Sequence, residues 1–214
     1  TDFGAPNYRI VAVDAGDPAP DKWRTIIPEG QFPIDGANHV GGRLIVQYLE
    51  HAKSVVRVHE TDGALSRTVE LPGIGAVAGF GGEADDPETF YLFTSFNRPT
   101  TIYRYDVAAG ESAIVKAPEL KFNPDDYVVE QAFFSSTGGV EVPMFIVRRK
   151  DVTANGTRPV LLYGYGGFNV SLPPAFSAAR LQWMEMGGVF ALANIRGGGE
   201  YGRDWHDGGR LRNK

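Results

Sequence analysis

The residues best suited to chemistry in this chain are the tyrosines of a glycine-rich stretch, residues 163–168, with the sequence Tyr-Gly-Tyr-Gly-Gly-Phe. The stretch follows an apolar run, 159–162, that predicts a buried strand, and it precedes a segment, 174–186, that predicts a helix. A glycine-rich turn between a strand and a helix brings backbone amides and a side chain to one point. A phenolic O–H at that point is a good donor to an oxyanion that develops during acyl transfer.

The nucleophile that such a loop would serve is not evident in the sequence. In α/β-hydrolases the loop after the third strand supplies half of the oxyanion hole, and the serine lies in a Gly-x-Ser-x-Gly turn. No Gly-x-Ser-x-Gly occurs among the 214 residues. The pattern therefore predicts an oxyanion loop whose nucleophile lies elsewhere.

The bulk composition is that of a soluble globular protein. Hydrophobic residues make up 43% of the chain and charged residues 22%, with a net charge of -5 and no basic block, which argues against disorder and against nucleic-acid binding. The absence of cysteine excludes a disulfide scaffold, a cysteine nucleophile and a thiolate metal site within this chain. No apolar stretch approaches the roughly 20 residues of a membrane span. These features do not fix the cellular compartment of the protein; the cytoplasm is favoured, and a bacterial periplasm is the alternative.

The first 120 or so residues contain an internal repeat. Residues 8–14, 55–60 and 101–106 resemble one another at offsets of about 46, and residues 43–49 and 89–95 form a second track at nearly the same offset. This period is typical of β-propeller blades. About two and a half blades are expected, which cannot close a ring, and an ordinary β-sandwich is the alternative.

Near residue 124 the pattern changes. Two strands joined by a turn at 135–139 are expected first, then a strand, a helix over 174–186 and a strand over 188–195. Strand, helix and strand form a βαβ unit and indicate a parallel sheet. An apolar helix face is predicted from Phe176, Ala179, Trp183 and Met186. The domains are expected at 1–124, a partial β-propeller, and at 125–214, the start of a catalytic domain.

Two glycine motifs in tandem point to a family. Residues 163–169 (Tyr-Gly-Tyr-Gly-Gly-Phe-Asn) and 194–202 (Asn-Ile-Arg-Gly-Gly-Gly-Glu-Tyr-Gly) together resemble the prolyl oligopeptidase family. The likeness runs from about residue 6 to residue 214. Shorter matches add to it at residues 143–147, 205–206 and 208–209 in the second half, and at residues 5–9 and 93–96 in the first half.

The resemblance implies a multi-domain β and α/β protein: the last blades of a seven-bladed β-propeller, then the N-terminal part of an α/β-hydrolase domain. It implies a serine endopeptidase that cleaves short proline-containing peptides after proline through an acyl-enzyme, with no cofactor or metal and no nucleic-acid or membrane partner. The family's Ser, Asp and His would follow residue 214. The chain then is an internal fragment, inactive alone, whose partner is the remainder of the same polypeptide.

The resemblance also assigns roles to single residues. Tyr165 is the oxyanion donor, and Phe168 is a wall of the proline pocket, since an aromatic ring can lie flat on a pyrrolidine ring. Tyr163 is expected to pack in the sheet. The glycines that let the backbone turn or approach closely are Gly164, Gly166 and Gly167.

The second motif resembles a phosphate-binding loop but lacks the Gly-x-Gly-x-x-Gly register and a Walker lysine. It is interpreted as a tight supporting loop at the end of a strand, formed by Arg196, Gly197, Gly198, Gly199 and Glu200. Its two charged residues are expected to pair with each other or with the missing part of the protein.

The histidines are interpreted as structural. His206 is rejected as general base because hydrolases of this type place that residue after the serine and the aspartate; it and Trp205 are expected to be buried anchors. His39, His51 and His59 are expected in blade strands, at spacings that match no zinc motif.

Two alternatives remain. The oligopeptidase B branch, which cleaves after basic residues, typically has Ser-Tyr where this chain has Gly167-Phe168, so these residues favour the proline-specific branch. The other alternative is a non-catalytic interaction module, since the chain holds no nucleophile–base pair.

Overall fold

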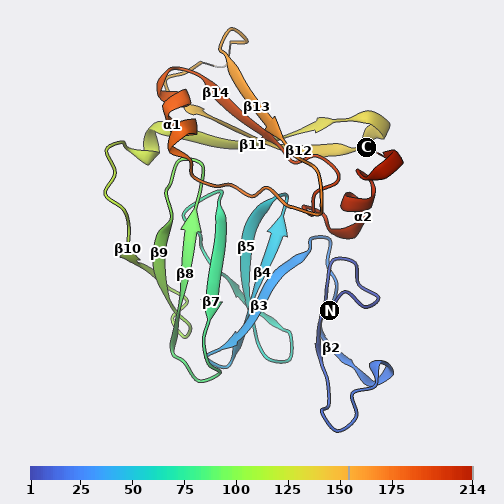
Figure 1. The fold of residues 1–214 in the computed structure, drawn as a ribbon. Coiled ribbons are helices and arrows are strands. Elements are labelled where there is room, and N and C mark those ends of the chain that lie inside the picture. The colour runs from blue at the N-terminus through green and yellow to red at the C-terminus, as the bar shows by residue number, and fades with distance from the viewer. Residues whose placement is uncertain (154, 214) are drawn as a thin grey trace.

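A computed structural model describes residues 1–153 and 155–213. Figure 1 shows two layers: sheets from the first half of the chain stand side by side, and a sheet from the second half lies across their ends. None of the helices described within these ranges is both long and apolar enough to cross a membrane.

The first half forms one two-stranded and two four-stranded antiparallel sheets. In each, strands adjacent in sequence are also adjacent in space. The sheets are β1 (Ile10–Ala12) with β2 (Arg24–Ile27); β3 (Ile34–Val40), β4 (Arg43–Glu50), β5 (Lys53–His59) and β6 (Leu65–Thr68); and β7 (Ala76–Gly81), β8 (Glu88–Thr94), β9 (Thr101–Asp106) and β10 (Ser112–Lys116).

Four of the five segments of the repeat occupy equivalent strands, whereas residues 8–14 contain β1 of the separate two-stranded sheet. β4 and β8 are second in their sheets, and β5 and β9 are third. Buried residues alternate with half-buried ones along most of β5, and its buried Val56 and Val58 join a core between the two four-stranded sheets. The same core holds Phe80, Tyr91 and Tyr105. The rings of Phe80 and Tyr91 stack at 4.5 Å. Repeated hairpins with two apolar faces therefore pack on each other as neighbouring blades do.

The second half forms a mixed sheet rather than a parallel one. β11 (Tyr127–Ser135) and β12 (Glu141–Arg149) make an antiparallel hairpin, and β14 (Val189–Ala193) is antiparallel to β12. Only β13 (Val160–Gly164) is parallel to β14, and α1 (Ala178–Glu185) connects them. The βαβ unit is as predicted, but the hairpin makes the other half of the sheet antiparallel.

The predicted helix over 174–186 is too long at its N-terminus. Ser177 has an extended backbone and is the N-cap, with its Oγ accepting a hydrogen bond from the backbone N–H of Arg180, so the helix begins only at Ala178. The predicted apolar face is right for Trp183, which packs against the core of the upper layer, and wrong elsewhere. Met184 is the buried residue, whereas Met186 is 73% exposed, and Phe176 precedes the helix and stacks on Phe122.

The apolar run before the glycine-rich loop is not buried. Val160 is 57% exposed and Leu162 is 65% exposed. β13 is an edge strand, with β14 as its single neighbour among the described strands. Leu161, which points to the opposite face from Val160 and Leu162, is 44% exposed, so side chains on both faces reach solvent. The strand prediction was right and the prediction of its burial was wrong.

The two layers meet at the turn between β4 and β5, which presents His51 and Ala52 to the upper sheet. His51 lies in this turn, with a φ of 51°, and not in a strand as predicted. Its Nδ1 lies 2.6 Å from the hydroxyl oxygen of Tyr201, and its ring meets Phe133 edge-on at 5.0 Å. Ala52 is fully buried in the core of the upper layer.

Burial lowers the pKa of His51, and the nearby ammonium of Lys53 lowers it further, while Glu50 opposes the shift. Burial also raises the pKa of its partner Tyr201 to about 12, with the Glu200 carboxylate adding to the effect. Both members of the pair are therefore neutral near pH 7. An unfolded chain takes up the histidine proton near pH 6.5, and the folded chain takes it up only at lower pH.

This difference predicts acid sensitivity at the contact between the layers. Because the folded-state pKa of His51 is depressed, the contribution of this contact to stability is complete above about pH 6.5 and falls as the pH drops below it. His51→Gln removes the titration. Urea unfolding at pH 7.5 and pH 5.5 is expected to show a smaller acid-dependent loss in this variant than in the wild type, whereas the exposed His39→Gln behaves as the wild type does. Equal losses in all three proteins would contradict the prediction.

Candidate active site

Tyr165 and Phe168 lie on the loop that leaves the carboxyl end of β13. Tyr165 is 44% exposed and Phe168 is 85% exposed, and their ring centroids are 6.5 Å apart. The Tyr165 hydroxyl makes no hydrogen bond with any residue in the described ranges. Tyr163, expected to pack in the sheet, lies in β13 but is 45% exposed, at an edge with which no other described strand pairs.

The backbone of this loop adopts conformations that are rare for residues other than glycine. Gly166 has a φ of 58°, and Phe168 and Asn169 have values of 54° and 59°, in the left-handed region that non-glycine residues seldom adopt. Two hydrogen bonds hold this geometry. The N–H of Val170 donates to the Gly167 carbonyl at 3.0 Å, and the N–H of Asn169 donates to the Gly197 carbonyl at 3.1 Å. The second bond ties the first glycine motif to the second.

The glycines of residues 197–199 allow the two loops to touch through their backbones. A Cβ at Gly197 would lie 2.2 Å from the Gly166 oxygen, and a Cβ at Gly199 would lie 2.8 Å from the Asn169 oxygen. Real Cβ atoms do not approach backbone oxygen so closely. Any side chain at these positions would push the Tyr165–Phe168 loop away from its platform.

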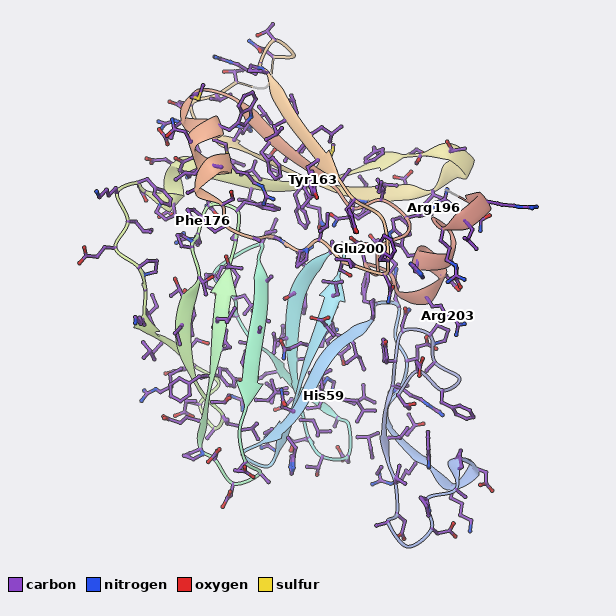
Figure 2. The ribbon with its side chains drawn as sticks, in the orientation of Figure 1. His59, Tyr163, Phe176, Arg196, Glu200 and Arg203 are labelled. Carbon is purple, nitrogen blue, oxygen red and sulfur yellow. The ribbon has the colours of Figure 1, made fainter. Side chains whose placement is uncertain are left out.

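Glu200 holds the far end of the loop. It is 1% exposed, and its Oε1 accepts from the backbone N–H of Leu172 at 3.1 Å and from Nδ2 of Asn194 at 3.2 Å. The Asn194 amide also donates to the Leu172 carbonyl at 2.9 Å. Figure 2 shows Glu200 where the two layers meet. The expected pairing of Arg196 and Glu200 with each other or with the missing part of the protein stays a prediction.

A short helix, α2 (Gly202–Asp207), supports the second motif from the other side. The N–H of Gly197 donates to the Trp205 carbonyl at 2.9 Å, and the Nδ1 of His206 lies 2.8 Å from the Gly197 carbonyl oxygen. Trp205 and His206 are half-buried rather than buried, since α2 lies at the surface. Its residues still act as anchors, because they contact the backbone of Gly197 at both its N–H and its carbonyl group.

The roles of Asn194 and Asn169 were missed at the level of sequence. Asn194 follows directly after the apolar run of β14, and a polar residue at that point was an available signal. The contacts of Asn169 with Gly197 and His206 join residues far apart in the chain, so the local pattern gave no indication of them.

A cavity of about 800 Å³ lies beside this platform. Residues near the N-terminus and β3 form one side, and Asn169, Ser171, Gly199, Arg203 and His206 form the other. Tyr165 and Phe168 do not line it. In the described ranges, no group of three or more acidic or histidine side chains is arranged to hold a metal ion.

Comparison with known protein families agrees with the fold. Residues 1–118 match the N-terminal β-propeller domain of prolyl oligopeptidase, and residues 174–214 match the prolyl oligopeptidase family. The first half is thus part of a propeller domain rather than a sandwich, and the second half is the start of the hydrolase domain.

Curated relatives agree as well. The chain is 42% identical over its whole length to a prolyl endopeptidase of Elizabethkingia miricola, and 43% identical over 98% of its length to that of Elizabethkingia meningoseptica. In each case it spans 30% of the relative's length.

Solved structures give the same result. A prolyl endopeptidase structure from a study of inter-domain dynamics in catalysis and specificity superposes with a TM-score of 0.92 at 45% identity, over 99% of this chain and 32% of that one. Prolyl oligopeptidase B from Galerina marginata, bound to a 25mer macrocyclization substrate, superposes with a TM-score of 0.90 at 30% identity, over 99% and 30%. Two glycine loops contact each other at the end of a βαβ unit that lies against the ends of propeller blades, and a family model covers more than half of the residues. This chain belongs to the prolyl oligopeptidase family.

Proposed function

We propose that the chain is part of a serine-type endopeptidase that hydrolyses short peptides on the carboxyl side of proline. One observation carries the proposal: the Tyr165 phenol is exposed on a rigidly supported loop and has no hydrogen-bond partner in the described ranges. A hydroxyl held in this way is ready to donate to an oxyanion without first breaking another bond. The relatives that the chain matches are named prolyl endopeptidases, which supports the same reaction.

The roles of the remaining site residues follow from this proposal. Tyr165 donates to the tetrahedral oxyanion, and Phe168 forms a flat apolar wall for the pyrrolidine ring of the substrate. Glycines of the two motifs, with Glu200, hold the loop in place. The nucleophilic serine, the histidine that accepts its proton and the aspartate that orients the histidine are supplied by further polypeptide.

The exposed edge of the sheet supports a role for additional polypeptide. Val160, Leu161 and Leu162 are between 44% and 65% exposed on a strand with a single neighbour. Apolar strands of this kind are normally covered on both faces in α/β folds. The division into propeller residues 1–124 and hydrolase residues 125–214 is part of the same proposal, and β11 begins three residues after it.

Replacing the Tyr165 hydroxyl tests the oxyanion role. Tyr165→Phe in the full-length protein removes the donor and keeps the ring, so kcat is expected to fall about 10²–10³-fold with little change in KM. Tyr163→Phe is a matched control, because this tyrosine lies two residues before Tyr165, near the end of β13, and is similarly exposed. Steady-state kinetics with a chromogenic proline peptide measures both variants. An unaltered turnover in Tyr165→Phe would remove Tyr165 from the mechanism.

Substrate preference separates the two peptidase branches. We expect a peptide with proline before the scissile bond to be cleaved at least tenfold faster, in kcat/KM, than its arginine counterpart, because Phe168 offers an aromatic face and no carboxylate. Phe168→Ala is expected to reduce this preference mainly through KM. Faster cleavage after arginine would favour the oligopeptidase B alternative, and no cleavage of either peptide would favour a non-catalytic module.

A further inference from the structure

Three atoms from distant parts of the chain meet behind the Tyr165–Phe168 loop. The backbone N–H nitrogen of Asn169 lies 3.1 Å from the carbonyl oxygen of Gly197 and 3.1 Å from Nδ1 of His206. The same Nδ1 lies 2.8 Å from that carbonyl oxygen. One glycine carbonyl is thus the meeting point of the first glycine motif, the second glycine motif and α2.

Each tautomer of His206 makes a hydrogen bond within this triangle. With its proton on Nδ1, the ring donates to the Gly197 oxygen, which has two lone pairs and accepts from Asn169 as well. With Nδ1 unprotonated, it accepts from the backbone N–H of Asn169. Through either bond, His206 supports the turn that carries Phe168.

The contact bears directly on the placement of Phe168. Asn169 follows Phe168, and both have left-handed φ values of 59° and 54°. Because Phe168 is 85% exposed, its direction depends on the backbone of these two residues rather than on packing around the ring. Tyr165 is placed differently, since it follows directly after β13, where Gly164 pairs with Ala193 of β14.

We propose that His206 is a positioning residue for substrate specificity: through its contact with the Gly197 carbonyl or the Asn169 N–H it holds the Phe168–Asn169 turn, and hence the wall that recognises proline. The inference rests on the proposed peptidase function. His206 touches neither substrate nor reacting atoms in this role, and it acts through the backbone of the loop. The oxyanion donor Tyr165, anchored by the sheet, depends on it much less.

The test compares proline with alanine before the scissile bond, in otherwise identical peptides and in the full-length protein. In His206→Ala the ratio of the two kcat/KM values is expected to fall about fivefold, through a higher KM for the proline peptide, with kcat within about twofold of the wild type. His206→Asn is expected to restore the ratio, since its side-chain amide can donate from near the Nδ1 position. A ratio of two substrates does not depend on the fraction of folded enzyme, so a purely structural loss would leave it unchanged.

His59→Ala is the matched control. Its Nδ1 also lies near a glycine carbonyl, 3.0 Å from that of Gly63, but in the propeller layer far below the loop (Figure 2). This variant is expected to keep the wild-type ratio. If His206→Ala does not give soluble protein, His206→Gln replaces it, because the longer side chain overshoots the Gly197 oxygen.

The outcomes separate the inference from the function on which it rests. A wild-type ratio in His206→Ala, or an equal fall in His206→Ala and His206→Asn, would overturn the positioning role while leaving the peptidase intact. Failure of the wild-type full-length protein to cleave either peptide would overturn the proposed function itself. A fall in His206→Ala that is absent in His206→Asn and in His59→Ala would support the inference.

Discussion

The contact between two backbones, at Gly166 and Gly197, is the constraint on which the candidate site depends. At a separation that leaves no room for a Cβ, the second motif can serve as a platform for the first. Two left-handed non-glycine residues are costly by themselves, at about 1–3 kcal/mol each for sparsely populated backbone geometry. Hydrogen bonds from Asn169 and Val170 offset this cost, and the side chains of Tyr165 and Phe168 are held out toward solvent as a result.

The two layers are joined through side chains rather than through a close contact of two backbones. A neutral histidine–tyrosine pair, ring edges and the buried Ala52 form the contact between the β4–β5 turn and the upper sheet. Tyr201 in this contact follows Glu200 directly, and Glu200 anchors the loop through Leu172 and Asn194. The interface and the site are therefore neighbours along one stretch of backbone. A shift of the propeller against the sheet would reach the loop through residues 200 and 201.

The sequence predicted the strands and loops that follow from local periodicity and local motifs. It did not predict burial and contacts that depend on residues brought together by the fold. The repeat located equivalent strands because blades reuse one alternation of apolar and polar residues, and the two glycine motifs located the loops. The start of α1 required recognition of Ser177 as a cap after two prolines. The contacts of Glu200 with Leu172 and of His51 with Tyr201 join residues far apart in the chain. The burial of residues 159–162 was predicted from hydrophobicity alone, which cannot distinguish an edge strand from a central one.

The exposed edge and the candidate site lie on the same strand, and this has a consequence for the proposed reaction. Ligand sites in parallel α/β sheets form at the carboxyl ends of strands, where loops from neighbouring strands meet. β13 contributes Tyr165 from its carboxyl end, and its own faces expose Val160 and Leu162. Polypeptide that covered these side chains would extend the sheet or its helical layer beside β13, and its loops would emerge next to the phenol. A nucleophile delivered in this way would approach Tyr165 from the uncovered edge, opposite the platform formed by Gly197 and His206.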